Sequence, residues 1–169
     1  ELFVLSPFIT GDTILEVFKT CRTTKRYLIT SLSPDAYLGG ALDIEILRLL
    51  IKEQVKVFHL KNLHAKVLFA GRHITVGSQN FTDGGKLNVE ASIALEITKS
   101  QKQNLEMSVN EIIEKSTFVD GDVLDVFELE AERYRNRYEE LQKGLLQVDE
   151  ALEEHFLKDN DVKDIALDE

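Results

Sequence analysis

The sequence lacks several features that mark common classes of protein. It has a single cysteine, Cys21, so no disulfide can form within the chain and no cysteine cluster can bind a metal. It has no run of about 18 or more apolar residues, the length that a membrane-spanning helix needs, and it has no internal repeat or low-complexity tract. We therefore expect a protein of the reducing cytoplasm, with no membrane partner, no metal and no other cofactor.

The composition is that of an ordinary globular domain. The chain has 169 residues, of which 43% are hydrophobic and 30% charged, enough to bury a core. The net charge of −10 is uneven: residues 1–80 carry 10 basic and 7 acidic side chains, whereas residues 81–169 carry 10 and 23. The mildly basic N-terminal half is compatible with a phosphate ligand but does not by itself indicate one. Because the chain opens with Glu1 rather than Met, we expect it to be a piece of a longer protein.

Hydrophobic periodicity predicts alternating strands and helices in the first two thirds of the chain. Strands are predicted at residues 2–9, 26–32, 55–60, 64–70, 74–77 and 89–97. Helices are predicted after Asp12 and at residues 41–53 and 99–116, with a loop at residues 33–40. This order indicates an α/β fold in which a mixed β-sheet is flanked by helices, and not the strict alternation of a doubly wound fold.

The remaining residues, 117–169, are predicted to form an acidic helical extension beyond a first domain at residues 1–116. Within a helix predicted at residues 122–158, apolar or aromatic residues recur at spacings of three and four: Ala131, Tyr134, Tyr138, Leu141, Leu145, Val148 and Leu152. Such spacing is typical of a coiled-coil or dimerisation element, and also of an amphipathic helix lying on its own domain. The sequence leaves both open. Gly144 is expected to interrupt the helix.

One group of residues could bind a phosphate and react with it. His64 and Lys66 are two apart on a predicted strand and should share a face, as should Ser78 and Asn80. A cation and two neutral donors beside an imidazole make a phosphate cradle that contains a nucleophile or base. Gly77 would let a bound group approach the backbone closely.

For the two pairs to meet across a hairpin, the strands must adopt a particular register. His64 must lie opposite Asn80, and Lys66 opposite Ser78. That register requires an odd number of residues in the loop, and residues 71–73 would supply three.

These residues resemble a known family. The pattern His64-x-Lys66, followed by Gly77-Ser78-x-Asn80, resembles the HKD motif of the phospholipase D superfamily. The Phe-Thr at 81–82, the Glu at 90 and the opening segment 5–9 are similar to its small nuclease members. The resemblance covers residues 1–116. The family's Asp, five positions after the Lys, falls at Gly71 here, and the connection is one residue shorter, which we interpret as a tighter turn.

The resemblance implies a metal-independent phosphodiesterase, and more narrowly an endonuclease, that acts through a phosphohistidine intermediate. His64 would be the nucleophile. Lys66, Ser78 and Asn80 would bind the non-bridging phosphate oxygens. Glu90 would accept the proton of the other ring nitrogen of His64 and orient the imidazole.

The family also uses a second histidine to protonate the leaving oxygen. His59, His73 and His155 have no such motif around them; His59 is expected to be structural and His73 exposed in the turn. A second copy of His64 is therefore expected, in a homodimer with one active site at the interface. A longer parent protein with a second motif is the other possibility.

The expected substrate is nucleic acid, DNA rather than RNA. Two alternatives remain open at this point. One is a hydrolase of phospholipids or other phosphodiesters. The other is a catalytically silent module that binds nucleic acid or mediates assembly within a larger protein.

Overall fold

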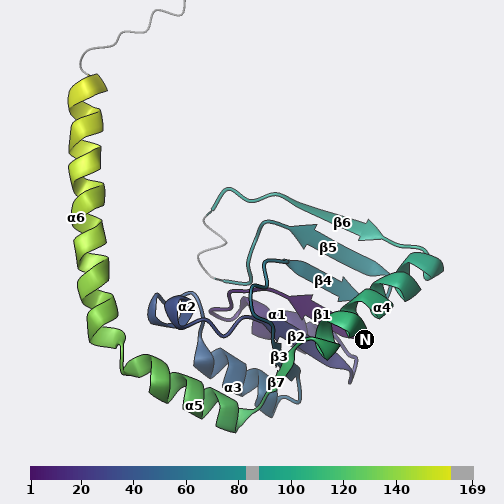
Figure 1. Ribbon diagram of the computed structural model, residues 1–169. Coiled ribbons are helices and arrows are strands. Elements are labelled where there is room, and N and C mark those ends of the chain that lie inside the picture. Colours follow the sequence, from purple (N-terminus) through teal and green to yellow (C-terminus); the bar gives the residue numbers. More distant parts are fainter. Residues whose placement is uncertain (83–87, 161–169) are drawn as a thin grey trace, which may run out of the picture. The chain divides into compact units, whose positions relative to one another are not determined.

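The computed structural model describes residues 1–82 and 88–160, and the chain divides into two compact units, Glu1–Ala131 and Glu132–Glu169 (Figure 1). The strands are β1 (Leu2–Leu5), β2 (Arg26–Thr30), β3 (Lys56–His59), β4 (Val67–Ala70), β5 (His73–Gly77), β6 (Ser92–Glu96) and β7 (Thr117–Val119). The helices are α1 (Thr13–Thr20), α2 (Pro34–Leu38), α3 (Ile44–Lys52), α4 (Lys99–Glu114), α5 (Gly121–Glu132) and α6 (Arg135–Asn160).

The strands of the first unit form one sheet in the order β6-β5-β4-β1-β2-β3-β7. β1 pairs with β2, and β2 with β3, in parallel, whereas the other four pairings are antiparallel. The predicted fold class, a mixed sheet flanked by helices, is confirmed. β1 lies in the middle and is buried on both faces, which explains why its sequence Leu-Phe-Val-Leu is apolar throughout and does not alternate.

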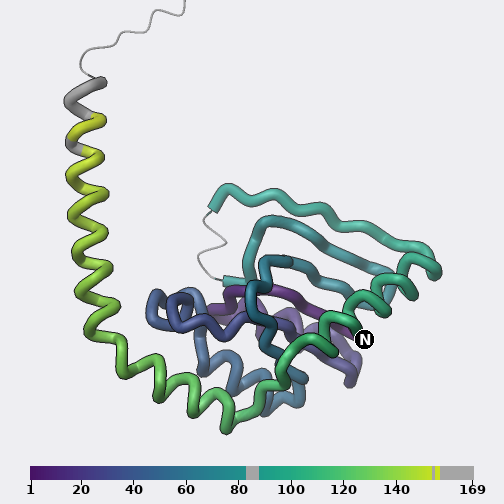
Figure 2. Tube along the Cα trace, viewed as in Figure 1, coloured from purple at the N-terminus to yellow at the C-terminus, as the bar shows by residue number. Residues whose placement is uncertain are grey.

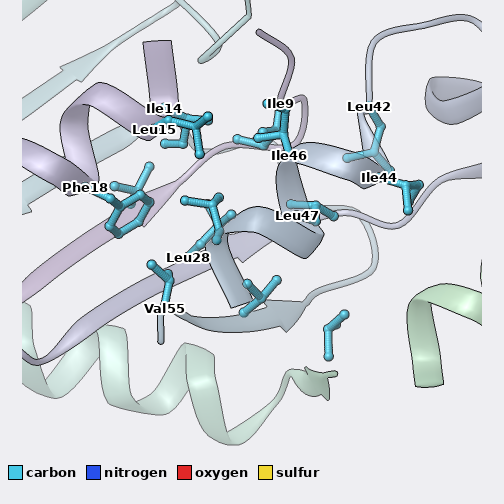
Figure 3. Packing of buried hydrophobic residues seen from close by; sticks show 14 of the residues in the cluster. Ile9, Ile14, Leu15, Phe18, Leu28, Leu42, Ile44, Ile46, Leu47 and Val55 are labelled. Carbon is cyan, nitrogen blue, oxygen red and sulfur yellow. The ribbon is translucent and has the colours of Figure 1, made fainter. Parts of the chain in front are cut away.

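The sheet has a hydrophobic core on each face. On one face Val4 and Leu28 pack with side chains of α1 and α3, such as Phe18 and Leu47 (Figure 3). On the other face α4 lies across the strands (Figure 2), and its Val109 packs in the cluster that contains Phe3 and its neighbours. The period of two along β1 sends Phe3 to one core and Val4 to the other.

Two elements were not predicted. Residues 33–40 were predicted as a loop, but they contain α2, which begins with Pro34 after the N-cap Ser33, whose side chain accepts a hydrogen bond from Ala36 N. The short strand β7 pairs with β3 at one edge of the sheet. α5 then packs within the first unit, where Leu124 is fully buried and Arg48 of α3 binds the carboxylates of Asp125 and Glu128.

The C-terminal helix differs from its prediction in where it breaks. The interruption expected at Gly144 is absent, because this residue lies inside α6, and the break falls at residues 133–134 between α5 and α6. A glycine in a helix interior costs only about 1 kcal/mol relative to alanine, which a helix of this length tolerates.

No helix in the described part of the chain is long and apolar enough to cross a membrane.

Candidate functional site

The β4–β5 hairpin determines where the motif residues lie. Its strands pair Val67 with Val76 and Ala70 with His73, so the turn contains only two residues. Beyond the strands, Gly77 N donates to Lys66 O at 3.3 Å. The predicted register, with Lys66 opposite Ser78 across a three-residue loop, is therefore wrong, and Lys66 lies opposite Gly77.

The turn explains this register. Gly71, its first residue, has a φ of 63°, a backbone conformation that glycine adopts without steric cost. A positive φ at the first central position is what a tight type II′ hairpin turn requires, so no third loop residue is needed. The short connection between Lys66 and Gly77 is thus closed by a two-residue turn that begins at Gly71.

The chain after β5 is held against the chain after β1. Ser6 is fully buried and its Oγ accepts a hydrogen bond from Phe81 N at 3.3 Å. Thr10 N donates to Phe81 O at 3.1 Å, and Ile9 forms a bridge with Phe81. These contacts fix the segment that carries Asn80.

Lys66 and Asn80 line one pocket of about 170 Å³. Its wall includes Gly77, Thr13 at the start of α1, and Ser92 of β6. The Lys66 Nζ donates to His64 O at 3.1 Å, which holds the ammonium beside the backbone of the histidine. The structure therefore brings a cation and an amide to the same small cavity, next to His64.

Two polar atoms in the wall of this pocket stand out. Thr13 Oγ1 and Asn80 Oδ1 are buried and have no hydrogen-bond partner in the described part of the chain. Buried polar atoms normally have a partner, so this pocket suits a polar ligand. Thr13 was missed from the sequence because nothing in a helix-start threonine distinguishes a pocket residue from an ordinary one.

Ser78 and Glu90 form a second contact beside the pocket. The Ser78 hydroxyl donates a hydrogen bond to the Glu90 carboxylate, and Ala91 N donates to Ser78 Oγ at 3.1 Å. Ser78 N also donates to Ala91 O at 3.0 Å. The Glu90 carboxylate thus binds Ser78 in this structure, and it does not contact His64 as the sequence predicted.

His64 itself is exposed and lies in the short segment between β3 and β4, after the buried Leu63. Within residues 1–82 and 88–160 no group hydrogen-bonds its imidazole. The ring is therefore open to a ligand from solvent. Among the described residues, its carbonyl oxygen connects it to the other motif residues by accepting a hydrogen bond from Lys66 Nζ.

No family model matches the sequence, and no curated protein matches it. Among solved structures, Nuc from Salmonella typhimurium, described as a phospholipase D family member, superposes with a TM-score of 0.53 at 14% identity, over 71% of this chain and 80% of Nuc. The chain has a phospholipase D-like fold.

Two further solved structures resemble parts of this chain. Phosphatidylserine synthase from Haemophilus influenzae Rd KW20 superposes with a TM-score of 0.55 at 14% identity, over 88% of this chain and 39% of the synthase. TrmBL2, an archaeal chromatin protein, gives 0.47 at 11% identity, over 70% of this chain. The chain spans 44% of the length of TrmBL2, so it corresponds to less than half of either protein. At these identities the similarity is one of fold.

Gly77 has a structural role in this phospholipase D-like fold. A Cβ at this position would lie 2.6 Å from Ser92 Cβ and 2.8 Å from Ala91 O, both closer than van der Waals contact allows. Gly77 pairs with Ser92 across the β5–β6 ladder. The glycine thus permits the close approach of β6, and it also lines the pocket.

The other histidines of the first unit lie apart from the pocket. His73 begins β5, opposite Ala70 and Glu96, at the far end of the hairpin from Lys66, and is exposed. His59 ends β3, and its Nδ1 accepts a hydrogen bond from Leu32 N at 3.0 Å. A neutral ring is required to accept this bond, which supports the structural role predicted for His59.

The environment of His59 predicts a pH dependence of stability. Burial lowers the pKa of His59 below its ordinary value of 6.5. The unfolded chain then takes up a proton at a higher pH than the folded chain does, so the free energy of unfolding should fall as the pH drops below about 6.5. The loss should continue until the pH has passed the lowered pKa of the folded state.

This prediction can be checked by urea unfolding at pH 7.5 and 5.5. The control is His59→Asn, whose amide oxygen can accept the same bond from Leu32 N and does not titrate. The wild type should lose more stability between the two pH values than the variant. Equal losses would show that another group is responsible.

Proposed function

We propose that the chain is a metal-independent phosphodiesterase that cleaves nucleic acid internally, with DNA preferred to RNA. The observation that carries this proposal is the placement of Lys66 and Asn80 in one pocket beside the exposed His64, on a phospholipase D-like fold. A cation and an amide offset charge on phosphate oxygens, and an accessible imidazole can attack phosphorus. Among the described residues no group of three or more His, Cys, Asp or Glu side chains forms that could bind a metal.

The proposed reaction has two steps. In the first, a ring nitrogen of His64 attacks phosphorus and forms an N–P bond while the bond to the leaving oxygen breaks. That oxygen takes a proton from His64 of a second copy of the chain. In the second step, water gives its proton to that histidine and attacks phosphorus, and the N–P bond breaks. Each histidine ends in its starting protonation state, and the net change is hydrolysis of one phosphodiester bond.

The supporting residues act on the phosphate. Lys66 and Asn80 bind non-bridging oxygens from the pocket wall, where charge develops in the transition state. Ser78 gives up its hydrogen bond to Glu90 and donates to the same phosphate group. Glu90 in turn positions Ser78, or turns to the imidazole of His64 when substrate is bound. Because the chain carries one such set of residues, two copies share one active site.

A second candidate function is that of a silent module that binds nucleic acid without cleaving it. The observation that favours it is the Ser78–Glu90 bond, which leaves His64 without the carboxylate partner that usually orients a catalytic imidazole. Both candidates bind nucleic acid, but only the phosphodiesterase cleaves it, so a cleavage assay distinguishes them.

The experiment is a cleavage assay in excess EDTA with the wild-type chain. The substrates are single- and double-stranded DNA and RNA of equal length, and vesicles of phosphatidylcholine with phosphatidylserine. Cleavage of DNA, with a phosphate label trapped on histidine in quenched samples, is the expected result. Binding without cleavage of any nucleic acid would support the silent module, and release of lipid headgroups alone would identify a lipase.

A further inference from the structure

The helix α6, taken by itself, carries an exposed apolar seam. The seam consists of Tyr138, Leu141, Leu145, Val148 and Leu152, together with Tyr134 just before the helix. Its seam residues are more than two-fifths exposed at most positions, for example Leu141 at 59%, Val148 at 54% and Leu152 at 47%. Most helical stability in proteins comes from packing of an apolar face, and not from the helix alone. A stripe of this kind therefore indicates a partner.

We propose that this partner is α6 of a second copy of the chain, packed antiparallel as a two-helix coiled coil. The seam residues from Tyr134 to Leu152 alternate in steps of four and three, as the a and d positions of heptads do. In the antiparallel arrangement each a residue meets a d residue of the partner. The layers then pair Tyr134 with the partner's Leu152, Tyr138 with the partner's Val148, and Leu141 with the partner's Leu145.

The distribution of charge determines the orientation. Residues 133–143 contain four basic and two acidic side chains, whereas residues 144–153 contain three acidic and no basic side chains. Antiparallel packing places the basic end of one helix beside the acidic end of the other, and it brings Arg135 next to Asp149 of the partner subunit. Parallel packing would instead bring like charges together.

The seam itself agrees with this orientation. These layers centre on residue 143, so Gly144 flanks the seam one residue from the two-fold axis and lies near Gly144 of the partner subunit. A glycine there lets the two backbones approach closely. Parallel packing would instead stack Tyr134 and Tyr138 on their own copies, with their hydroxyl groups near the centre of the interface.

This inference concerns the second unit alone and does not depend on any chemistry at His64. Its readout is the association of chains, whereas the proposed function is read from bond cleavage, so either can fail without the other. If both hold, α6 supplies a means of bringing the two chains of the proposed shared active site together.

The first experiment compares Leu145→Asp with Leu146→Asp in the full chain by sedimentation equilibrium. The residues are adjacent, 48% and 59% exposed, and equal in helix propensity, but only Leu145 lies in the seam. We expect the dimer dissociation constant to rise at least about 100-fold for Leu145→Asp, because two Leu layers are lost, and to change little for Leu146→Asp. A monomeric wild type, or equal effects of the two substitutions, would overturn the proposal.

The second experiment determines orientation with a short bis-maleimide in a Cys21→Ser background. The double variant Tyr134→Cys with Leu152→Cys should form covalent dimers, while neither single variant should. In the antiparallel pair the two copies of position 152 lie about 27 Å apart, since a helix rises about 1.5 Å per residue. Cross-linking of each single variant would show a parallel pair, and no cross-linking of the double variant would place the contact elsewhere.

Discussion

Replacing His64 by alanine is expected to reduce EDTA-resistant cleavage of DNA by a factor of about 10⁴ or more. Removal of a catalytic nucleophile in other hydrolases has effects of this size, because the remaining groups still bind substrate but cannot form the covalent intermediate. His64 is exposed and accepts no side-chain bond in the described part of the chain, so its loss should leave the fold intact. Cleavage rate and urea unfolding are measured on the same preparation.

The matched control is His73→Ala, which removes an exposed histidine of the β4–β5 hairpin at its far end from Lys66. This variant should cleave at close to the wild-type rate. A His64→Ala protein that retains cleavage, or a His73→Ala protein that loses as much, would contradict the assignment. If two chains share the site as proposed, activity should fall as the square of the wild-type fraction when wild type is mixed and refolded with His64→Ala.

Replacing Gly77 by alanine is expected to lower the free energy of unfolding by about 1–3 kcal/mol, the usual cost of forcing extra volume into a packed region. The new Cβ would lie 2.6 Å from Ser92 Cβ and 2.8 Å from the carbonyl oxygen of Ala91. Neither neighbour is the flexible end of a side chain, so β6 must move away from β5. The measurement is urea unfolding. The slope of the unfolding free energy against urea concentration should be the same for the variant and the wild type.

The control for this substitution is Gly121→Ala, because a Cβ at Gly121, the first residue of α5, meets nothing within 4 Å. Its stability should be unchanged or slightly raised, since alanine is the better helix former. Cleavage should also fall in Gly77→Ala, because the backbone of Ala91 holds Ser78 on both its amide and its hydroxyl. Equal unfolding free energies for the two variants would show that β6 accommodates the added carbon.

Strands β1 to β6 and helices such as α3 and α4 could be predicted because each reflects a local pattern. The apolar run at β1 and the periodicities of α3 and α4 are written in consecutive residues. β7 could not be predicted in the same way. Its sequence Thr-Phe-Val is too short to show alternation, and it becomes a strand only because the edge of β3 is available to pair with it.

The candidate site, too, could be predicted only in part. The spacing predicted Lys66 opposite Ser78, whereas Lys66 lies opposite Gly77 and lines a pocket with Asn80. The partner of Glu90 could not be predicted, because it depends on how far β6 extends beside Ser78. Thr13 enters the pocket from α1, more than fifty residues earlier in the chain, and no local pattern reports such a contact.

The sequence by itself therefore determined the kind of fold and the kinds of side chain available for phosphate chemistry, since both follow from residue types at short spacings. Only the tertiary structure decided the hairpin register, the reason for Gly77 and the binding of Ser78 by Glu90. Each of these depends on a distance between strands, which is set by packing of the whole sheet and by the two-residue turn at Gly71.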